Sequence, residues 1–500
     1  MIAWLLVPAA VGAVLSAVRW LRVAQREHYL AGSATRFAIR WWRVPPVNLV
    51  LFVIGMSAGI AGFWWPAAGI GAMLAAAIGP VGLGLRGRTS PLRWTARMRR
   101  LAVLTALLAI GVTAAALPLG AVLVVGSLVA ILLPLLLDLA LWLLAPLERR
   151  LGRRFVDHAD ARLRSVAPLV VAITGSYGKT TTKEYLRSLL STRFNTVATP
   201  ASFNNAMGLA RTINEQLSPG VEVFVAEMGT YGPGEIADLV SWVQPRVAVI
   251  TAIGPVHLER FGSLEATTRA KQEILATADV AVLNVDDARL AELAETFSGR
   301  VVRCSSLDSG ADVMVQTNGA VCIDRNRVAT VDSSSLFAGN LACAVGAALA
   351  VGMSPEEIGA AAAALAGPDH RRTVVASPGV VSIVDDTYNA NPAGAVAALE
   401  TLAGLGENGG RRVVVTPGMV ELGARQQAEN EAFARAAVEV ASDLIVVGQT
   451  NRVALLKGAA GSTANVVSVA TRDEAVAWAR SNLRDGDAVL YENDLPDHYP

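Results

Sequence analysis

Charged residues are scarce in this chain of 500 residues. Asp, Glu, Lys and Arg make up 17% of it, and the formal net charge is only +1. A protein that binds the phosphate backbone of a nucleic acid presents a clear excess of Lys and Arg, and that excess is absent here. We therefore expect no nucleic-acid partner.

Cysteine is also rare. The three cysteines, Cys304, Cys322 and Cys343, lack the short spacings of a zinc site. They provide no disulfide framework of the kind that stabilises small secreted domains. We therefore expect the part of the chain that carries them to lie in a reducing compartment.

Apolar residues are abundant instead. They make up 53% of the chain, the mean hydropathy is +0.44, and the excess lies in the first 146 residues. Apolar runs occupy residues 2–18, 47–65, 67–85, 101–117 and 121–144. Each run approaches the roughly 20 residues with which a helix crosses a bilayer. We predict about five membrane-spanning helices, and soluble core helices are the alternative.

Arginine clusters indicate an orientation for these helices. They follow the first, third and fifth apolar runs, whereas the connections near Pro66 and at 118–120 carry no charge. Because cytoplasmic loops carry the excess of Lys and Arg, we expect an inner (plasma) membrane, multi-pass protein with its catalytic domains in the cytoplasm. The lipid bilayer is then a partner. Asp138 lies in the fifth run. A carboxylate at that position either has a functional role or pairs with another helix.

A glycine-rich stretch, Thr-Gly-Ser-Tyr-Gly-Lys-Thr-Thr, occupies residues 174–181. Residues 168–173 before it are typical of a buried strand, and a helix is expected to begin near Lys179. The backbone N–H groups of such a loop and the helix N-terminus bind phosphate. Lys179 then reaches the terminal phosphates and Thr180 binds Mg²⁺. The spacing is shorter than the usual Walker A pattern, and a glycine turn with a surface lysine is the alternative.

Strands and helices alternate after this loop, which predicts α/β layers with parallel sheets. Glu227 follows a strand at 221–226 and His257 follows one at 247–253. Ligands bind at such carboxyl ends of strands. Lys271 lies on an expected helix at 264–276. Taken singly, each of these three residues is equally well a structural or surface residue.

The chain is expected to fold as three parts. A Gly-Pro pair at 367–368 marks a boundary, after which a second α/β pattern begins without a glycine-rich dinucleotide fingerprint. The predicted domains are a multi-span α-helical membrane region at 1–165, a P-loop central ATPase domain at 166–368 and a C-terminal Rossmann-like α/β domain at 369–500.

The chemical motifs together resemble the Mur ligase family. The matching stretches, in family order, are 174–181, Asn204-Asn205, 227–229 (Glu-Met-Gly), 257–263 with Lys271, 284–287, 385–392 and 418–423. The resemblance covers residues from about 168 to 490. It implies an ATP-dependent ligase that converts a carboxylate to an acyl phosphate, which an amine then attacks. Within the family the chain looks most like the members that add D-alanyl-D-alanine to the UDP-muramoyl tripeptide in peptidoglycan precursor synthesis.

The resemblance also implies site residues. The implied catalytic residues are Lys179, Glu227, His257 and Lys271. Thr180, Glu227, His257 and Lys271 are the implied ligands of two Mg²⁺ ions, with Lys271 carbamylated. The implied ATP contacts are Gly175, Ser176, Tyr177, Gly178, Lys179, Thr180, Thr181, Asn284, Asn340, Arg371 (or Arg372), Asp386, Tyr388 and Asn391.

The chain departs from the family pattern in several places. The family's N-terminal UDP-sugar domain is absent, and the apolar region takes its place. A family histidine appears as Asn430, and the family's Lys-Gly-Ser-Arg is replaced by an acidic stretch that begins at Tyr491. The carboxylate substrate is therefore open, either a small molecule or a lipid-linked one, and the oligomeric state is open too. A P-loop ATPase coupled to transport is the alternative from another class.

Overall fold

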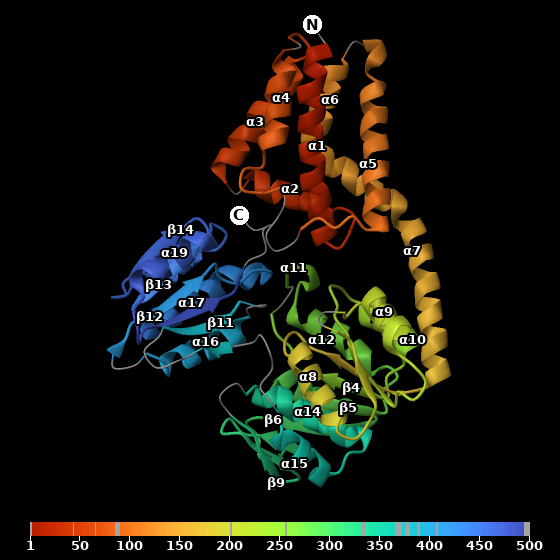
Figure 1. Ribbon diagram of the computed structural model, residues 1–500, viewed down its shortest axis with the longest axis vertical. Coiled ribbons are helices and arrows are strands. Elements are labelled where there is room, and N and C mark those ends of the chain that lie inside the picture. The colour runs from red at the N-terminus through yellow and green to blue at the C-terminus, as the bar shows by residue number, and fades with distance from the viewer. Residues whose placement is uncertain are drawn as a thin grey trace. The chain divides into compact units, whose positions relative to one another are not determined.

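The computed structural model describes residues 3–43, 45–65, 67–85, 91–119, 121–200, 203–255, 258–332, 336–365, 373–375, 381–387, 391–406 and 409–494 (Figure 1). The chain divides into two compact units, Met1–Leu151 and Gly152–Asp494. The first unit is helical, and the second contains two sheets with helices packed on them.

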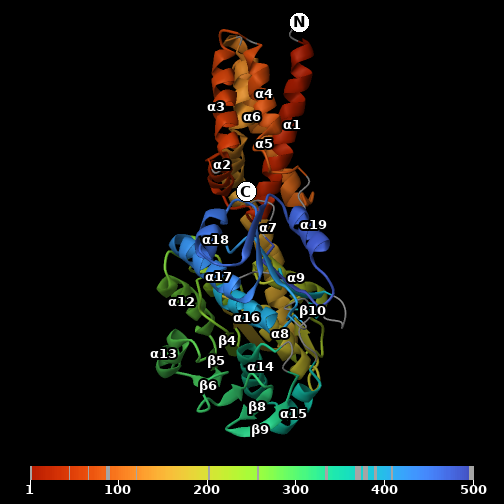
Figure 2. The ribbon, with the colours of Figure 1, turned by 90° about the vertical axis from the view of Figure 1, so that its left-hand side faces the viewer.

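The first unit is a bundle of helices. They are α1 (Ala3–Arg26), α2 (Ser33–Arg43), α3 (Pro46–Ala61), α4 (Ala68–Ile78), α5 (Ala96–Ala114), η1 (Leu117–Leu119), α6 (Val122–Ile131) and the start of α7 (Leu133–Val166). Helices α1, α3, α4 and α6 lie side by side (Figure 2). Glycines permit this close packing: a Cβ on Gly55 would lie 2.7 Å from Ala75 Cβ, and one on Gly59 would lie 2.7 Å from Leu128 Cδ2.

Two charged residues of this unit cap helix ends. The guanidinium of Arg19, which is 4% exposed, donates to the carbonyl oxygens of Ala77 and Leu83, each at 3.0 Å. It thereby places a positive charge at the C-terminal end of α4, where orphan carbonyls carry partial negative charge. The Asp138 carboxylate accepts from the backbone N–H groups of Ala34 and Thr35, at 3.2 and 2.8 Å, at the start of α2. Asp138 therefore has a structural use as a helix cap.

The prediction of a multi-pass inner-membrane protein with about five spanning helices is wrong. Within the described residues, one helix is long and apolar enough to cross a membrane, Ala96–Leu119, or up to three if each bent helix pair counts as one span. Helices α3 and α4 have 16 and 11 residues, and α6 has 10. At about 1.5 Å per residue, none of these reaches the hydrocarbon thickness of about 30 Å. The apolar runs at 47–65 and 67–85 thus form helices too short to cross a membrane singly.

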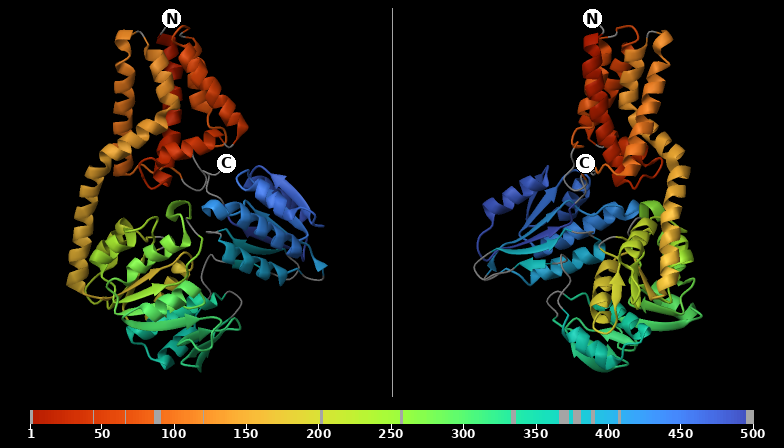
Figure 3. Two further views of the ribbon diagram at one scale, coloured as in Figure 1. Left: turned by 180° about the vertical axis from the view of Figure 1, so that it is seen from behind. Right: turned by 45° about the vertical axis from the view of Figure 1, so that its right-hand side comes forward.

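Helix α7 is continuous from Leu133 to Val166, although Pro146 lies inside it (Figure 3). The boundary between the two compact units, at Leu151 and Gly152, falls within this helix. Ala159 and Leu163, near its end, belong to the core of the second unit. The predicted domain limits at 165 and 368 stay predictions.

The first sheet of the second unit has nine strands in the order β2-β3-β1-β4-β5-β6-β7-β8-β9. Strands β1 to β7 pair in parallel, and β7, β8 and β9 form an antiparallel edge. The strands are β1 (Leu169–Thr174), β2 (Thr196–Ala198), β3 (Val223–Glu227), β4 (Val247–Ile250), β5 (Val280–Asn284), β6 (Arg300–Ser305), β7 (Val313–Val315), β8 (Ala320–Ile323) and β9 (Asn326–Thr330).

Helices cover both faces of this sheet, and their bounds are α8 (Lys179–Leu190), α9 (Ala206–Gln216), α10 (Glu235–Val243), α11 (Leu258–Phe261), α12 (Leu264–Gln272), η2 (Glu273–Leu275), α13 (Ala288–Thr296), α14 (Ala338–Val351) and α15 (Pro355–Ala363). Because side chains alternate along a strand, Val171 and Ile173 of β1 face one core, whereas Val170 and Ala172 face the other. Helices α8, α14 and α15 supply the first core, and α9, α10 and α13 supply the second.

The second sheet has six strands in the order β10-β11-β15-β12-β13-β14, all parallel except β10. The strands are β10 (Thr373–Val375), β11 (Ser382–Asp386), β12 (Arg412–Thr416), β13 (Asp443–Val447), β14 (Asn465–Val469) and β15 (Ala488–Glu492). Its helices are α16 (Pro392–Ala403), η4 (Gly423–Arg425), α17 (Gln426–Val440), α18 (Arg452–Ala459) and α19 (Arg472–Asn482). The prediction of two α/β domains with largely parallel sheets is confirmed.

Candidate active site

The glycine-rich loop joins β1 to α8, as the sequence predicts. Gly175 has φ +156° and Gly178 has φ +84°. A Cβ on Gly175 would lie 2.0 Å from Thr251 Oγ1, and one on Gly178 would lie 2.3 Å from Asn340 Oδ1. Both positions therefore require glycine, for space and, at Gly178, for the left-handed backbone.

The segment that follows β4 holds this loop in place. The backbone N–H of Ser176 donates to the carbonyl of Ala252 at 2.8 Å, and the hydroxyl of Thr251 donates to the carbonyl of Tyr177 at 2.5 Å. The Ser176 hydroxyl in turn accepts from the N–H of Gly254 at 2.9 Å. The loop is thus preformed before any ligand binds, which lowers the entropy cost of binding.

Several hydrogen-bond donors converge at the start of α8. The backbone N–H groups of its first turn have no carbonyl partner within the helix, and the helix dipole adds partial positive charge. Among the described residues, the buried hydroxyl of Thr181 has no hydrogen-bond partner. Lys179 Nζ donates to the Gly175 carbonyl at 2.7 Å, so the ammonium group lies over the loop. This arrangement of donors and positive charge suits a phosphate chain.

Glu227 lies at the end of β3, next to this helix start. Its Oε2 atom accepts from Thr180 Oγ1 and from Lys183 Nζ, each at 3.1 Å. Its Oε1 atom accepts from Asn204 Nδ2 at 3.2 Å. The Glu227 residue is 1% exposed, so its carboxylate is held on both oxygens inside the protein.

The pair of Thr180 and Glu227 fits a Mg²⁺ ion. A hydroxyl and a carboxylate oxygen are hard oxygen ligands, and Mg²⁺ is usually held by one or two such groups together with phosphate oxygens. The two side chains meet beside the predicted phosphate position, which is where such an ion is needed. Among the described residues, no three His, Cys, Asp or Glu side chains come together, so this site would depend on phosphate and water for its remaining ligands.

Lys271 lies on α12 and is 4% exposed. Burial, and then the positive charge of Lys179, hold the pKa of Lys271 well below its usual value. Within the part of the chain that the structure describes, no side chain forms an ion pair or hydrogen bond with it. His257, which the family resemblance implies as a metal ligand together with Lys271, lies outside the described residues.

Two of the predicted ATP contacts also lie near the loop. Asn340 on α14 lies against Gly178. Asn284, at the end of β5, donates from Nδ2 to the carbonyl of Thr251 at 3.0 Å. The central sheet thus brings together the residues of the loop with Glu227, Asn284 and Asn340, although the last two are far away along the chain.

The remaining predicted ATP contacts belong to the second sheet. Asp386 ends β11, where its strand pairs with Glu492 of β15. Asn391 precedes α16 and caps it, because its Oδ1 atom accepts from the N–H of Gly394 at 3.0 Å. Arg371 (with Arg372) and Tyr388 lie outside the described residues.

The departures from the family pattern have structural roles in the second sheet. Asn430 donates to and accepts from the backbone of Met419, at 2.9 and 2.8 Å, and so holds the turn that follows β12. Glu492 is fully buried, with Oε2 accepting from the Thr416 hydroxyl and Oε1 having no partner among the described residues. Burial first, and then the nearby Asp386, raise the pKa of Glu492 to about 8, while the Thr416 hydrogen bond opposes the rise.

Sequence reasoning missed a role for Lys183, Asn204 and Thr251. Lys183 carries a faint signal, because it lies four residues after Lys179 and so shares a helix face with it. Thr251 carries no such signal, since it acts through a contact with a distant segment. Asn204 belongs to a stretch that matches the family, but its hydrogen bond to Glu227 comes only from the tertiary structure.

Comparisons with known proteins agree with this architecture. The Mur ligase middle domain matches residues 173–335, and the Mur ligase glutamate ligase domain matches residues 370–491. A UDP-N-acetylmuramoyl-tripeptide--D-alanyl-D-alanine ligase from Mycobacterium tuberculosis is 33% identical over 367 residues, which are 64% of this chain and 69% of that protein. The enzyme of the same name from Escherichia coli is 31% identical over 325 residues, which are 62% of this chain and 71% of that protein.

A solved structure is similar as well. A crystal structure of MurF from Acinetobacter baumannii has a TM-score of 0.60 and 28% sequence identity, and the match covers 69% of this chain and 77% of that chain. Because both sheet domains match, and because the identity extends over two thirds of these relatives, this chain belongs to the Mur ligase family of ATP-dependent ligases that form amide bonds.

Proposed function

We propose that this Mur ligase joins a substrate carboxylate to an amine through an acyl phosphate, in the synthesis of a peptidoglycan precursor. The observation that carries the proposal is the phosphate loop with the Thr180–Glu227 hydrogen bond of 3.1 Å at its helix start. The relatives are named as enzymes that join D-alanyl-D-alanine to a UDP-N-acetylmuramoyl tripeptide. Their names support D-alanyl-D-alanine as the amine and the UDP-muramoyl tripeptide as the carboxylate.

The first step needs positive charge. A carboxylate oxygen that attacks the γ-phosphorus of ATP brings two anions together, and the site must offset their repulsion. Lys179 and the N–H groups of the first turn of α8 would bind the phosphates and orient them. Mg²⁺ held by Thr180 and Glu227 would neutralise the charge that develops on the phosphate oxygens. The carboxylate then gains a phosphoryl group and ADP leaves.

The second step forms the amide bond. The amine nitrogen attacks the acyl carbon, inorganic phosphate leaves, and the nitrogen loses a proton. In this proposal the site also excludes water, since water would hydrolyse the acyl phosphate. The burial of Glu227 and Lys271 near the loop supports a dry site.

We assign Lys271 and His257 to a second Mg²⁺ ion, with Lys271 carbamylated. A neutral lysine nitrogen attacks the carbon of CO₂ and releases a proton, which converts a cation into an anion. The burial of Lys271 beside Lys179 supports this assignment, because both features favour the neutral amine. Without carbamylation, a buried lysine here would add positive charge to a metal site.

The remaining residues complete the ATP site in this proposal. Gly175, Ser176, Tyr177, Gly178 and Thr181 contact phosphates, and Asn284 and Asn340 contact the nucleotide. Arg371, Asp386, Tyr388 and Asn391 contribute from the C-terminal domain, at 369–500, which would close on the central domain, at 166–368, when ATP binds.

Product analysis tests the proposal. Purified full-length protein is incubated with ATP, Mg²⁺ and D-alanyl-D-alanine, with either UDP-muramoyl tripeptide or its lipid-linked form as the acid. We expect ADP, phosphate and a product whose mass equals the two substrates less one water. A lipid-linked product would change the acid while leaving the ligase chemistry in place. ADP release that never depends on an amine would overturn the ligase and favour an ATPase.

Glu227→Gln is the matching variant for this assay. It keeps the shape of the side chain but removes the negative charge proposed to hold Mg²⁺. Amide formation should then fall by about 10²-fold or more, since loss of one electrostatic contact to a transition state has that scale. Lys457→Met, which removes an exposed ion pair in the C-terminal domain, is the control and should keep full activity.

A further inference from the structure

Lys183 is fully buried on α8, close to the predicted phosphate and metal site. Its Nζ atom lies 3.1 Å from Glu227 Oε2 and 3.7 Å from Glu184 Oε1. Three and four residues separate it from Thr180 and Lys179, so all three side chains leave the same face of the helix. Lys183 is thus a second lysine near the start of α8. Its side chain is directed into the protein and contacts the carboxylate of Glu227, the last residue of β3.

The contacts of Glu227 show what Lys183 does. Thr180 and Lys183 both donate to Oε2, while Asn204 donates to Oε1. Of these three donors, only Lys183 carries a charge. A buried carboxylate is stable as an anion only when a charge of opposite sign or a metal ion compensates it. Lys183 therefore keeps Glu227 charged and oriented within a dry part of the protein.

We propose that Lys183 is a positioning residue for Mg²⁺ binding: its ammonium holds the carboxylate of Glu227 in the orientation that binds the metal together with Thr180. This inference rests on the proposed assignment of Mg²⁺ to Thr180 and Glu227. A carboxylate oxygen has more than one lone pair, so the contact with Lys183 persists while Glu227 binds the ion or one of its waters. Groups that hold metal ligands from behind have this role in metal sites generally.

A purely structural ion pair is the competing explanation, and it makes a different prediction. A structural pair affects the stability of the fold but leaves the metal requirement of the folded protein unchanged. A positioning residue changes the metal requirement and acts through Glu227. The two explanations are therefore separated by measuring metal binding in protein that is shown to be folded.

The test measures Mn²⁺ binding to the protein in the presence of ADP, which supplies phosphate oxygens, from the electron paramagnetic resonance signal of the Mn²⁺ that is not bound to protein. A mixture of Mn²⁺ and ADP without protein gives the reference signal. Lys183→Met should weaken Mn²⁺ binding by about 10- to 100-fold, the usual cost of losing a group that orients a metal ligand. Lys183→Arg keeps the charge and should restore most of the affinity. The control, Lys457→Met, removes the exposed pair with Glu431 and should bind Mn²⁺ as the unaltered protein does.

Kinetics supply a second measurement. In Lys183→Met the half-saturating Mg²⁺ concentration should rise, while the rate at saturating Mg²⁺ should largely recover. A folded Lys183→Met protein with unchanged Mn²⁺ affinity and unchanged Mg²⁺ requirement would overturn the inference. Absence of Mn²⁺ binding in the unaltered protein would instead overturn the metal site itself, and the inference with it.

A double variant covers the case in which Lys183→Met does not fold. If that variant unfolds because Glu227 is left as an uncompensated charge, then Lys183→Met/Glu227→Gln should fold, since no buried charge remains. A double variant that is as unstable as the single one would show that Lys183 does not act through Glu227, and would reject the proposal.

Discussion

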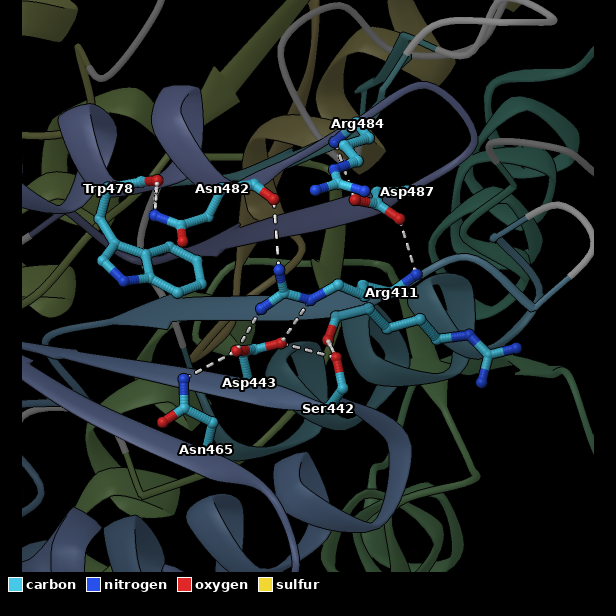
Figure 4. A network of polar contacts seen from close by, with 9 residues as sticks. Arg411, Ser442, Asp443, Asn465, Trp478, Asn482, Arg484 and Asp487 are labelled. Atoms are coloured by element: carbon cyan, nitrogen blue, oxygen red, sulfur yellow. Dashed lines mark hydrogen bonds and ion pairs between the residues drawn. The ribbon is translucent and has the colours of Figure 1, made fainter.

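Arg411 and Asp443 form a bidentate ion pair at the amino ends of the parallel strands in the second sheet. Arg411 Nη2 lies 2.6 Å from Asp443 Oδ1, and Arg411 Nε lies 3.2 Å from Oδ2 (Figure 4). Asn465 and Ser442 donate to the same carboxylate, at 3.0 and 2.7 Å. Asp386 and Glu492 are the last residues of β11 and β15, so they lie at the carboxyl ends of the strands, opposite the ion pair.

This pair is expected to stabilise the C-terminal domain. Arg411→Met leaves the buried Asp443 without its cation and should lower the free energy of unfolding by about 2 kcal/mol, less than for a wholly buried pair because Arg411 is partly exposed. Burial is the largest single influence and raises the pKa of Asp443, but the hydrogen bonds from Arg411, Ser442 and Asn465 and the charge of Arg411 together outweigh it. The net pKa of Asp443 therefore lies below the usual value. The stabilisation is therefore present at neutral pH and is lost as the pH falls through that lowered pKa.

Urea unfolding of both proteins at pH 7 and pH 3 measures this effect. The difference in stability should be smaller at the lower pH. Lys457→Met breaks an exposed pair with Glu431 and should cost less than about 1 kcal/mol. If Arg411→Met costs no more than this control, the ion pair does not stabilise the domain.

Glu492 is expected to make the stability fall as the pH rises. Its pKa is raised to about 8 in the folded protein, chiefly by burial, so the folded state binds more protons than the unfolded state between the usual carboxyl pKa and 8. Stability contributed by the neutral acid is full below that window and is lost on passing upward through it. Glu492→Gln should remove this slope and stabilise the protein at pH 9.

Denaturant unfolding between pH 5 and pH 9 tests the prediction for Glu492. The unaltered protein should lose a few kcal/mol of stability across this range relative to Glu492→Gln, by an order-of-magnitude conversion of the pKa shift. Parallel pH profiles for the two proteins would show that Glu492 does not titrate in this way.

Gly178→Ala is expected to damage the phosphate loop for two separate reasons. The left-handed backbone costs about 1–2 kcal/mol for a residue with a Cβ. The new Cβ would also lie 2.3 Å from Asn340 Oδ1, so the loop or α14 must shift. Both the melting temperature and ATP affinity should therefore fall.

A second glycine separates these two causes. Gly220 has φ +92° and nothing lies within 4 Å of the position of its Cβ, so Gly220→Ala reports the backbone cost alone. We expect Gly178→Ala to be the more destabilising, with loss of ATP binding only in that variant. Equal effects on stability and normal ATP affinity in both would show that the contact with Asn340 does not matter.

Lys271→Ala tests the proposed carbamate. We expect loss of amide formation, because a negative charge beside the proposed second Mg²⁺ would be missing. A small carboxylate such as acetate, which fits the space left by the lysine side chain, should restore part of the activity. Carbon-13 NMR with labelled bicarbonate should show a carbamate signal in the unaltered protein that Lys271→Ala lacks. Full activity in Lys271→Ala without any added acid would refute the assignment.

Local chemistry explains what was predictable. The phosphate loop lies in one short stretch, so a buried strand, two glycines, a lysine and a threonine were enough to predict it and the helix that follows. The alternation of strands and helices predicted two parallel sheets for the same reason, since periodicity is a property of neighbouring residues. The predicted ends of individual helices were less accurate. The helix expected at 264–276 is α12, which ends at Gln272, followed directly by the short helix η2.

Apolar composition was a poor guide to the N-terminal unit, because it does not show where a helix stops. The runs at 47–65 and 67–85 become α3 and α4, with 16 and 11 residues. Arg19, which directly follows the first apolar run, belongs to an arginine cluster that predicted a cytoplasmic connection, yet it is buried against the end of α4. A carboxylate inside an apolar run, Asp138, proved to be a helix cap, which depends on a partner more than 100 residues away.

By itself, then, the sequence determined the family, the alternation of strands and helices in the two α/β domains, and the position of the glycine-rich loop that we propose binds phosphate. These depend on contiguous residues and on the order of motifs along the chain. Only the tertiary structure decided that Lys183, Thr180 and Asn204 surround Glu227, and that Thr251 holds the loop. Those contacts join segments 23 to 74 residues apart, and a pairing of that kind arises from the parallel register of β1, β3 and β4.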